Sequence, residues 1–558
     1  MHTGARTALL LLTACLAPAQ TSVLLDAMAS ELDRNFQVLK EKADPKPYYL
    51  SCQVTEQEFS VISASLGAIT ASNQGRSRTL DVSVRVGSPK LDNYHRVRGE
   101  RAQFTSGSPL TLDEAPAAIR RRIWLDTDRA YRAAAERLVK IRSSARVRVA
   151  EEDDSDDFSP AEPATHEEAR PKAAFRAAEW EQRLRELSAR FSRHPGVLTA
   201  NISLLWQDET RYFVNSEGAR LRHGRGYARI VVSARGKAED GMDLSTGTTF
   251  EAVEPSGLPA APALAKAIDQ VAEDLEALLR APVADPFVGP AIFSGRAAGV
   301  FFHEIFGHRV EGHRQKDESE GQTFTRSVGT KILPEFLSVT FDPTRRKAAG
   351  VDLNGWYLFD DEGVKARPVP VVEQGVLKAF LMSRSPIRGF ERSNGHGRRQ
   401  PGNEVVSRQS NLIVESARSV PEAELRRMLV EEVKRQGKPY GLFFRDVTGG
   451  FTQTGRGGVQ AFKVIPVVVF RVYPDGRPDE LVRGADMVGT PLASFAKILA
   501  TSQGTEVFNG YCGAESGSVP VGAVSPALLV SEIEIEKTAK SQDRPPLLPA
   551  PPVNGGAR

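Results

Sequence analysis

The sequence predicts an α+β protein. The N-terminal domain is expected to mix helices with mainly antiparallel strands. The C-terminal domain is expected to be β-rich, sandwich- or barrel-like, with one histidine-bearing helix that Ser294 or Gly295 can begin. Residues 21–42 repeat apolar side chains at helical spacing, whereas residues 79–86 alternate apolar and polar side chains like a half-buried strand. Beyond residue 286, short β-type runs alternate with glycine-containing turns, a pattern typical of sandwiches and barrels.

The N-terminal half is expected to alternate between helices and strands. After the helix over residues 21–42, Asp126 can cap a helix that runs to about Lys140, since an aspartate before an apolar-periodic segment favours a helix start. Two more amphipathic helices are expected at residues 178–193 and 264–279. Strands are expected at residues 48–54, 60–66, 79–86, 196–206, 210–215 and 227–234.

An acidic stretch interrupts this half of the chain. Residues 151–157 are acidic at every position but one, and a proline-containing piece follows. Runs of like charge repel one another and stay in water, so the stretch at about 150–176 is predicted to be a solvated linker or insertion.

The composition changes near residues 281–286, where a domain boundary is expected. The predicted domains are residues 20–284 and 285–540. The proline-rich tail, residues 541–558, is predicted to be disordered. In the C-terminal domain, strands are expected at residues 357–363, 375–381, 464–470 and 528–535.

The N-terminus resembles a signal peptide. A short basic start precedes an apolar run that is too short to span a bilayer, and Ala17-Pro-Ala19 offers small residues for cleavage. We therefore expect residues 1–19 to be removed and the protein to be exported, to the periplasm or outside the cell. In a second interpretation, Leu12-Thr-Ala-Cys15 is a lipobox and Cys15 is lipidated. No later segment predicts a transmembrane helix.

The net charge indicates whether the chain could bind nucleic acid, and the number of cysteines limits the possible disulfides. The chain has 73 basic and 70 acidic side chains, a net charge of +3, and no long basic tract, so no nucleic-acid partner is expected. Removal of residues 1–19 leaves two cysteines, Cys52 and Cys512. One disulfide between them is the simplest expectation in an oxidising compartment, and a metal-binding role for Cys512 is the alternative.

His303 and His308 enclose a glutamate in the pattern H-E-x-x-x-H, one residue longer than the familiar zinc-hydrolase motif. In a regular helix, residues five apart point about 140° away from each other. A π-bulge, or a turn loosened at Gly307, would bring the two imidazoles together. Otherwise Glu304, His308 and Glu311 share one helical face and could hold a metal, or all these residues are ordinary polar side chains on a surface helix.

A catalytic zinc usually takes three protein ligands and leaves one position for water. His313 and Asp317 are close in sequence to the two histidines. Cys512 is distant but lies between glycines, which allow close approach of the backbone, and its thiolate would be a strong zinc ligand. The residues alone leave the choice between Cys512 and His313 open.

The two segments His303-Glu-Ile-Phe-Gly-His308 and Cys512-Gly-Ala-Glu-Ser-Gly-Ser-Val-Pro-Val-Gly522 together resemble the TldD/PmbA family of metallopeptidases, in particular its zinc-bearing, TldD-like members. Asp360-Asp-Glu-Gly363 and Asn394-Gly-His-Gly-Arg-Arg399 add to the resemblance, which is strongest over residues 287–537. The resemblance implies one Zn²⁺ per chain.

The same resemblance implies roles for individual residues. It makes His303, His308 and Cys512 the zinc ligands and Glu304 the general base that helps water attack a peptide carbonyl. The implied substrates are small or unstructured peptides, which are degraded or trimmed.

The resemblance also implies a homo- or heterodimer with a related family subunit. Gly449 and Gly450 are candidates for a β edge that grips an extended peptide, with a flexible loop as the alternative. Arg398 and Arg399 are candidates for binding a substrate carboxylate. The alternative is that they form surface or structural ion pairs, as most arginines do.

Two other functions remain open on the sequence. The chain could be a non-catalytic structural or binding subunit, which the presence of the full residue set disfavours. It could also be a non-hydrolytic metal enzyme that uses Glu304, His308 and Glu311. Zinc bound with a sulfur ligand would favour the peptidase, and iron bound only by nitrogen and oxygen would favour this rival.

Overall fold

The computed structural model describes residues 22–96, 102–105, 107–145, 153–168, 173–457, 462–489, 494–538, 544–546 and 548. The expected signal peptide, including Cys15, lies outside these residues, and so does most of the expected C-terminal tail. Within the described part of the chain, no helix is long and apolar enough to cross a membrane.

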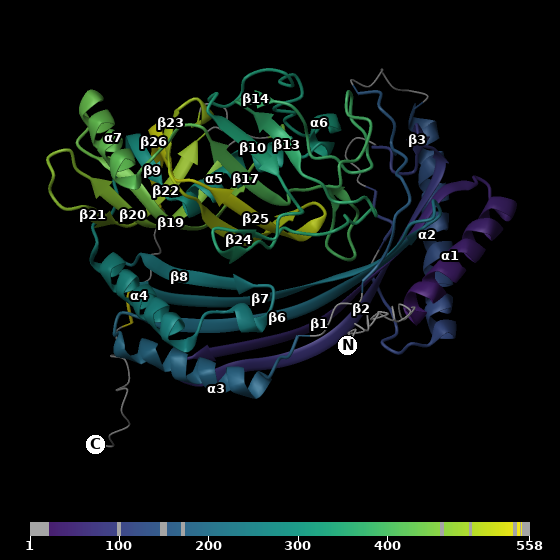
Figure 1. Ribbon diagram of the computed structural model, residues 1–558, viewed down its shortest axis with the longest axis horizontal. Coiled ribbons are helices and arrows are strands. Elements are labelled where there is room, and N and C mark those ends of the chain that lie inside the picture. Colours follow the sequence, from purple (N-terminus) through teal and green to yellow (C-terminus); the bar gives the residue numbers. More distant parts are fainter. Residues whose placement is uncertain are drawn as a thin grey trace, which may run out of the picture.

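The N-terminal half is built on one large, mainly antiparallel sheet with the strand order β3-β2-β1-β6-β7-β5, in which β4 pairs with β2 and β8 pairs with β7. Its long strands curve beneath the C-terminal half (Figure 1). The strands are β1 (Pro47–Ser65), β2 (Ala68–Ser88), β3 (Leu91–Asp92), β4 (Ser108–Pro109), β5 (Thr165–Glu167), β6 (Thr199–Asn215), β7 (Arg220–Lys237) and β8 (Asp243–Ala252).

Helices cover the two ends of this sheet. At one end α1 packs on α2 and β1, and at the other α3 and α4 pack against the sheet and each other, as Figure 1 shows. Apolar side chains of these helices and the sheet form two separate cores. The helices are α1 (Val23–Lys42), α2 (Pro116–Ala145), α3 (Ala177–Ser188) and α4 (Ala261–Arg280).

Several predicted elements are longer in the structure. The strands expected at 48–54 and 60–66 are one strand, β1, because the polar residues between them still pair with β2 and β6 on both sides. The start predicted for the second helix is wrong. Helix α2 begins at Pro116, and Asp126 lies inside it, buried and paired with Arg122 and Arg129.

Most described residues of the stretch at about 150–176 are exposed or half-buried, but three consecutive residues are not. Asp157, Phe158 and Ser159 are all buried. The Phe158 ring lies 4.8 Å from the ring of Tyr49, and the guanidinium of Arg384 stacks on it at 4.0 Å. Because Arg384 belongs to the C-terminal half, this segment joins the two halves rather than separating them.

The C-terminal half contains a six-stranded sheet and a closed ring of strands. The sheet has the order β14-β13-β10-β17-β25-β24, and the ring runs β9-β19-β20-β22-β26 and back to β9. These strands are β9 (Phe287–Phe293), β10 (Leu337–Phe341), β13 (Val369–Glu373), β14 (Val376–Leu377), β17 (Asn411–Ser416), β19 (Gly441–Thr452), β20 (Phe462–Val472), β22 (Ala485–Gly489), β24 (Glu506–Ala514), β25 (Gly517–Ser525) and β26 (Leu528–Lys537).

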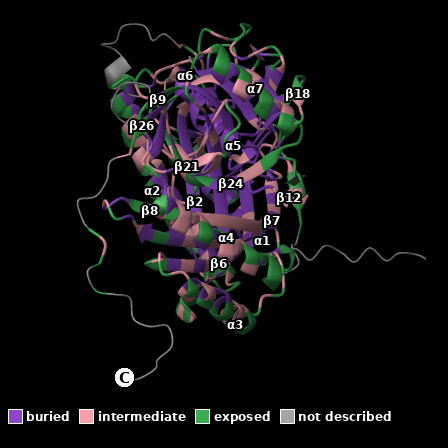
Figure 2. Cartoon of the chain, turned by 90° about the vertical axis from the view of Figure 1, so that its left-hand side faces the viewer, coloured by how far each residue is buried: buried purple, intermediate pink, exposed green. Residues whose placement is uncertain are grey.

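The predicted α+β class and the β-rich, barrel-like C-terminal half are confirmed, with two local corrections. Residues 357–363 form a turn with one isolated bridge, and residues 375–381 contribute the short β14 and an isolated bridge at Leu381. Each segment contains a turn instead of one continuous strand, because Gly363 and Gly375 have positive φ. Purple, buried residues fill the interior of the C-terminal half in Figure 2.

Candidate metal centre

Helix α5 (Gly295–Ile305) is the central element of the C-terminal half. It begins where the sequence predicts, because the Ser294 hydroxyl accepts a hydrogen bond from the backbone N–H of Ala297 and caps the helix. The helix packs between the ring strands β19 and β20 and the sheet strands β24 and β25. It therefore holds His303 and Glu304, in its last turn, at a fixed depth inside the domain.

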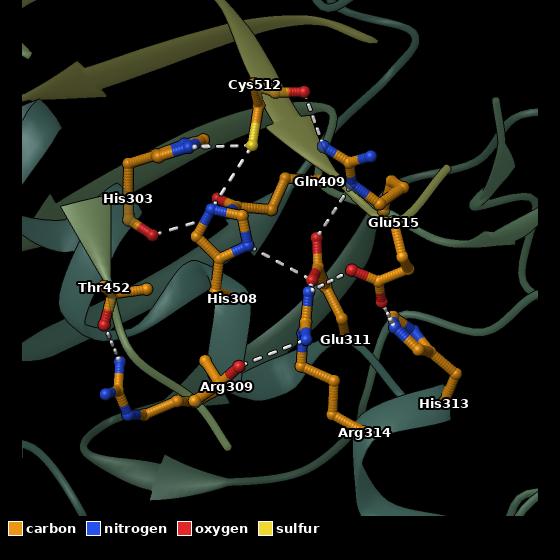
Figure 3. A network of polar contacts seen from close by, with 12 residues as sticks. His303, His308, Arg309, Glu311, His313, Arg314, Gln409, Thr452, Cys512 and Glu515 are labelled. Carbon is orange, nitrogen blue, oxygen red and sulfur yellow. Dashed lines mark hydrogen bonds and ion pairs between the residues drawn. The ribbon is translucent and has the colours of Figure 1, made fainter. Parts of the chain in front are cut away.

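The helix ends before His308. Residues Gly307–Val310 form a 3₁₀ turn, so the expected turn at Gly307, and not a π-bulge, brings the imidazoles together. The ring centroids of His303 and His308 are 5.1 Å apart (Figure 3). A side chain at position 307 would force Gln409 to move, because its Cβ would clash with the side-chain amide of Gln409.

Cys512, on strand β24, completes a buried cluster. Its Sγ lies 3.3 Å from Nε2 of His303 and 3.3 Å from Nε2 of His308. One ligand atom from each of the three residues lies within 4.8 Å of the others. Both Cys512 and Cys52 are free, and Cys52 lies in an N-terminal core, so the disulfide that was the simplest expectation does not form.

The charges of the cluster favour a thiolate. Burial alone would raise the pKa of the Cys512 thiol, but the neighbouring His308 and His303 outweigh burial and lower that pKa well below its ordinary value. Burial opposes the charged form of His308 as well, yet Cys512 and Glu311 raise its pKa. A thiolate and imidazole nitrogens that converge in a buried site are the donors that zinc prefers.

Glu311 supports His308 from the side away from Cys512 (Figure 3). Nδ1 of His308 donates to Glu311 over 3.2 Å, and this fully buried carboxylate also accepts from Arg314. Arg408 lies 3.3 Å from Glu311 and donates to the backbone oxygen of Cys512. The expected alternative trio of Glu304, His308 and Glu311 does not share a helical face, because α5 ends at Ile305.

His313, the other candidate ligand, is not part of the cluster. Its ring contacts the carboxylate of Glu515 and is buried. Asp317 pairs with Arg96. Within the described residues, the group that could hold a metal therefore contains Cys512 and not His313.

A cavity of about 530 Å³ opens beside the cluster, and we call it the His/Cys cavity. His303, Glu304, His308 and Cys512 line it, together with the β19 segment Thr448–Thr452. Gly450 lies against the glutamate, since a Cβ at position 450 would stand 2.7 Å from Glu304 Cγ. Burial raises the pKa of Glu304 above its ordinary value.

The arginines singled out in the sequence lie elsewhere. Arg398 is buried, stacks on Tyr357 and donates to the backbone oxygen of Gln409. Arg399 is also buried and donates to Gln53. Neither side chain lines the His/Cys cavity, whereas Gly449 and Gly450 both do.

Sequence reasoning missed Gln409 and Arg229, and it considered Glu311 only as a possible metal ligand. Glu311 and Gln409 orient the histidines, the latter by donating to the backbone oxygen of His303 over 3.3 Å. Arg229 reaches the cavity from strand β7 of the N-terminal half. No local motif marks Arg229, because only the packing of the two halves brings it to the cavity.

The sequence and the fold of this chain are similar to those of several known proteins. Residues 288–537 match the model of the PmbA/TldA metallopeptidase C-terminal domain. A metalloprotease of Methanocaldococcus jannaschii is 27% identical over 317 residues, which are 56% of this chain and 64% of that protein. A metalloprotease TldD homolog of Haemophilus influenzae is 26% identical over 318 residues, 55% of this chain and 61% of that protein.

The matched region thus spans less than two thirds of the length of both relatives. The fold as a whole resembles that of TldE from Thermococcus kodakarensis, with a TM-score of 0.61 and 15% identity. That match covers 91% of this chain and 99% of TldE.

Proposed function

Since this chain belongs to the TldD/PmbA family, we propose that it is a zinc metallopeptidase that hydrolyses peptide bonds in small or unstructured peptides. One observation supports this proposal above all. The cavity that contains the convergent His303, His308 and Cys512 also contains the carboxylate of Glu304.

The three side chains fit zinc by number, donor type and burial. Structural zinc sites usually have four protein ligands, whereas catalytic sites have three and one open position. The convergence of Cys512 with both histidines supports Cys512, rather than His313, as the third ligand. Zinc bound here would polarise a peptide carbonyl and acidify water in the cavity.

Glu304 is the proposed general base. Its carboxylate takes a proton from the attacking water and passes that proton to the amine that leaves. Burial supports this role, because a raised pKa makes a carboxylate a better proton acceptor and donor near neutral pH. Gly450 sets where the side chain stands, as no larger residue fits against it.

Strand β19 is the proposed support for an extended peptide. Gly449 and Gly450 line the cavity and carry no side chains to block main-chain pairing with a substrate strand. Recognition through the main chain would select for unfolded segments and give little side-chain selectivity. Degradation or trimming of peptides fits that behaviour.

The related partner subunit and the exported location belong to the same proposal. The likeness to the fold of TldE supports a partner of the same fold, as a homo- or heterodimer. Sizing combined with light scattering would measure the assembly. The mature protein is expected to begin near Gln20, and mass spectrometry of its N-terminus would instead find a lipidated Cys15 if the alternative holds.

The substitution Glu304→Gln tests the function. It should reduce peptide hydrolysis at least ~100-fold, the lower range for loss of general base catalysis, while zinc content stays the same. Glu318→Gln, which makes the same change at an exposed position, is the matched control and should remain active. Turnover retained by Glu304→Gln would exclude Glu304 as the base.

A further inference from the structure

One face of strand β7 turns basic residues toward the proposed active site. Because side chains alternate along a strand, Arg225, Tyr227 and Arg229 lie on the same face. Arg229 lines the His/Cys cavity, while Arg225 and Tyr227 line a smaller cavity of about 180 Å³. Tyr511, the neighbour of Cys512, lines both cavities and packs edge-on against Tyr227.

Of the residues that the structure describes, two arginines line the His/Cys cavity, and neighbouring carboxylates neutralise the charge of Arg229 less than that of Arg314. The other arginine that lines the cavity, Arg314, contacts three carboxylates, those of Glu311, Glu320 and Glu515. Arg229 has one acidic neighbour, Glu251, directly opposite on β8, and Nε stands 3.5 Å from the Glu251 carboxylate.

This pair is loose. Neither Nε of Arg229 nor Oε1 of Glu251 has a hydrogen-bond partner among the described residues. Burial raises the pKa of Glu251, which weakens its ability to neutralise the arginine. The Arg229 side chain keeps 24% of its surface exposed and lines the His/Cys cavity.

We propose that Arg229 binds a carboxylate of the peptide substrate in the His/Cys cavity. A guanidinium offers paired N–H donors that match the two oxygens of a carboxylate. The carboxylate has two sources, the C-terminus of the peptide or an acidic side chain. The inference rests on the proposed peptidase function and deepens it, because it assigns a specificity residue to the N-terminal half.

Four peptides of one sequence separate the two sources. They combine a free or amidated C-terminus with Glu or Gln next to the cleaved bond. Wild-type protein should cleave carboxylate-bearing peptides about tenfold to a hundredfold faster, as kcat/KM, than the neutral amide, the range expected for a charge-assisted hydrogen bond. Preference for the free C-terminus or for Glu identifies the source.

Arg229→Gln should lose that preference, so that it cleaves carboxylate-bearing peptides and the neutral amide at similar kcat/KM. Arg229→Lys should retain part of the preference, since it keeps the charge but not the paired donors. The matched control is Arg235→Gln, the same change at an exposed position of β7 outside the cavity, and it should behave like wild type. Equal preference in Arg229→Gln and wild type would overturn the assignment, as would a wild type without preference.

Binding measurements keep this test separate from the test of the peptidase function. If wild-type protein cleaves none of the peptides, the proposed function fails. Calorimetry on the Glu304→Gln protein then measures whether the carboxylate-bearing peptides bind more tightly than the neutral amide. The same measurement on the double variant with Arg229→Gln shows whether that difference in affinity is lost. Equal affinity for acid and amide would reject the role of Arg229.

Discussion

The backbone of Gly450 lies directly against the side chain of Glu304, so closely that a Cβ at position 450 would stand 2.7 Å from Glu304 Cγ. The glycine belongs to strand β19 and the glutamate to helix α5. The strand proposed to hold the substrate and the proposed base therefore fix each other's position.

Gly450→Ala should displace Glu304 and lower peptide hydrolysis by about 100-fold, since a shift of about 1 Å in a catalytic group can have that effect. Zinc content should not change, because the atoms nearest to a Cβ at position 450 belong to Glu304 and Lys463 and not to the three proposed ligands. Steady-state kinetics and metal analysis on the same sample measure both effects. Gly457→Ala is the control, as a Cβ there meets nothing within 4 Å, and full activity in Gly450→Ala would refute the packing argument.

Gly307→Ala should destabilise the protein by about 1–3 kcal/mol, the usual effect of overpacking a buried site. The new methyl group would displace Gln409, which donates to the backbone oxygen of His303, and would disturb the turn that positions His308. Urea unfolding measures the change. Adding Gln409→Ala should recover part of the loss, and strictly additive effects of the two substitutions would show that the contact does not matter.

Glu311→Gln should weaken both the fold and the proposed metal site. His308 and Arg314 hold the pKa of Glu311 well below its ordinary value against the effect of burial, so the carboxylate is charged in the folded protein. Removing one partner of a buried ion pair typically costs about 3–5 kcal/mol of stability. Loss of a group that orients a ligand lowers metal affinity about 10- to 100-fold.

Chelator competition and urea unfolding of the metal-free protein distinguish these two effects of Glu311→Gln. Glu415→Gln, an exposed position on β17, is its control. Unchanged zinc affinity in Glu311→Gln would mean that Glu311 does not position His308.

The sequence predicted the fold class and the start of α5 because both depend on local patterns. Apolar periodicity marks α1 and α4, and a serine followed by a helical segment marks the cap at Ser294. The full length of β1 was not predictable in this way. Its polar centre is held by pairing on both sides, and pairing with distant strands leaves no trace in the local pattern.

In the candidate site, too, local features were predictable from the sequence and contacts between distant segments were not. The spacing of His303 and His308 allowed a π-bulge, a turn at Gly307 or a different metal-binding face, and the structure contains the turn. The contact of Cys512 with both histidines depends on strand β24 lying beside α5, so the residues alone left His313 equally open. Arg229 depends on how the two halves pack, and no sequence signal marked it.

The central claim is that His303, His308 and Cys512 bind one zinc ion, and elemental analysis of purified protein tests it most directly. Wild-type protein and Cys52→Ser should each contain about one zinc per chain, because Cys52 lies in an N-terminal core away from the histidines. Cys512→Ser should contain much less. The account would be contradicted by full zinc content in Cys512→Ser, or by wild-type protein that binds no zinc when zinc is supplied.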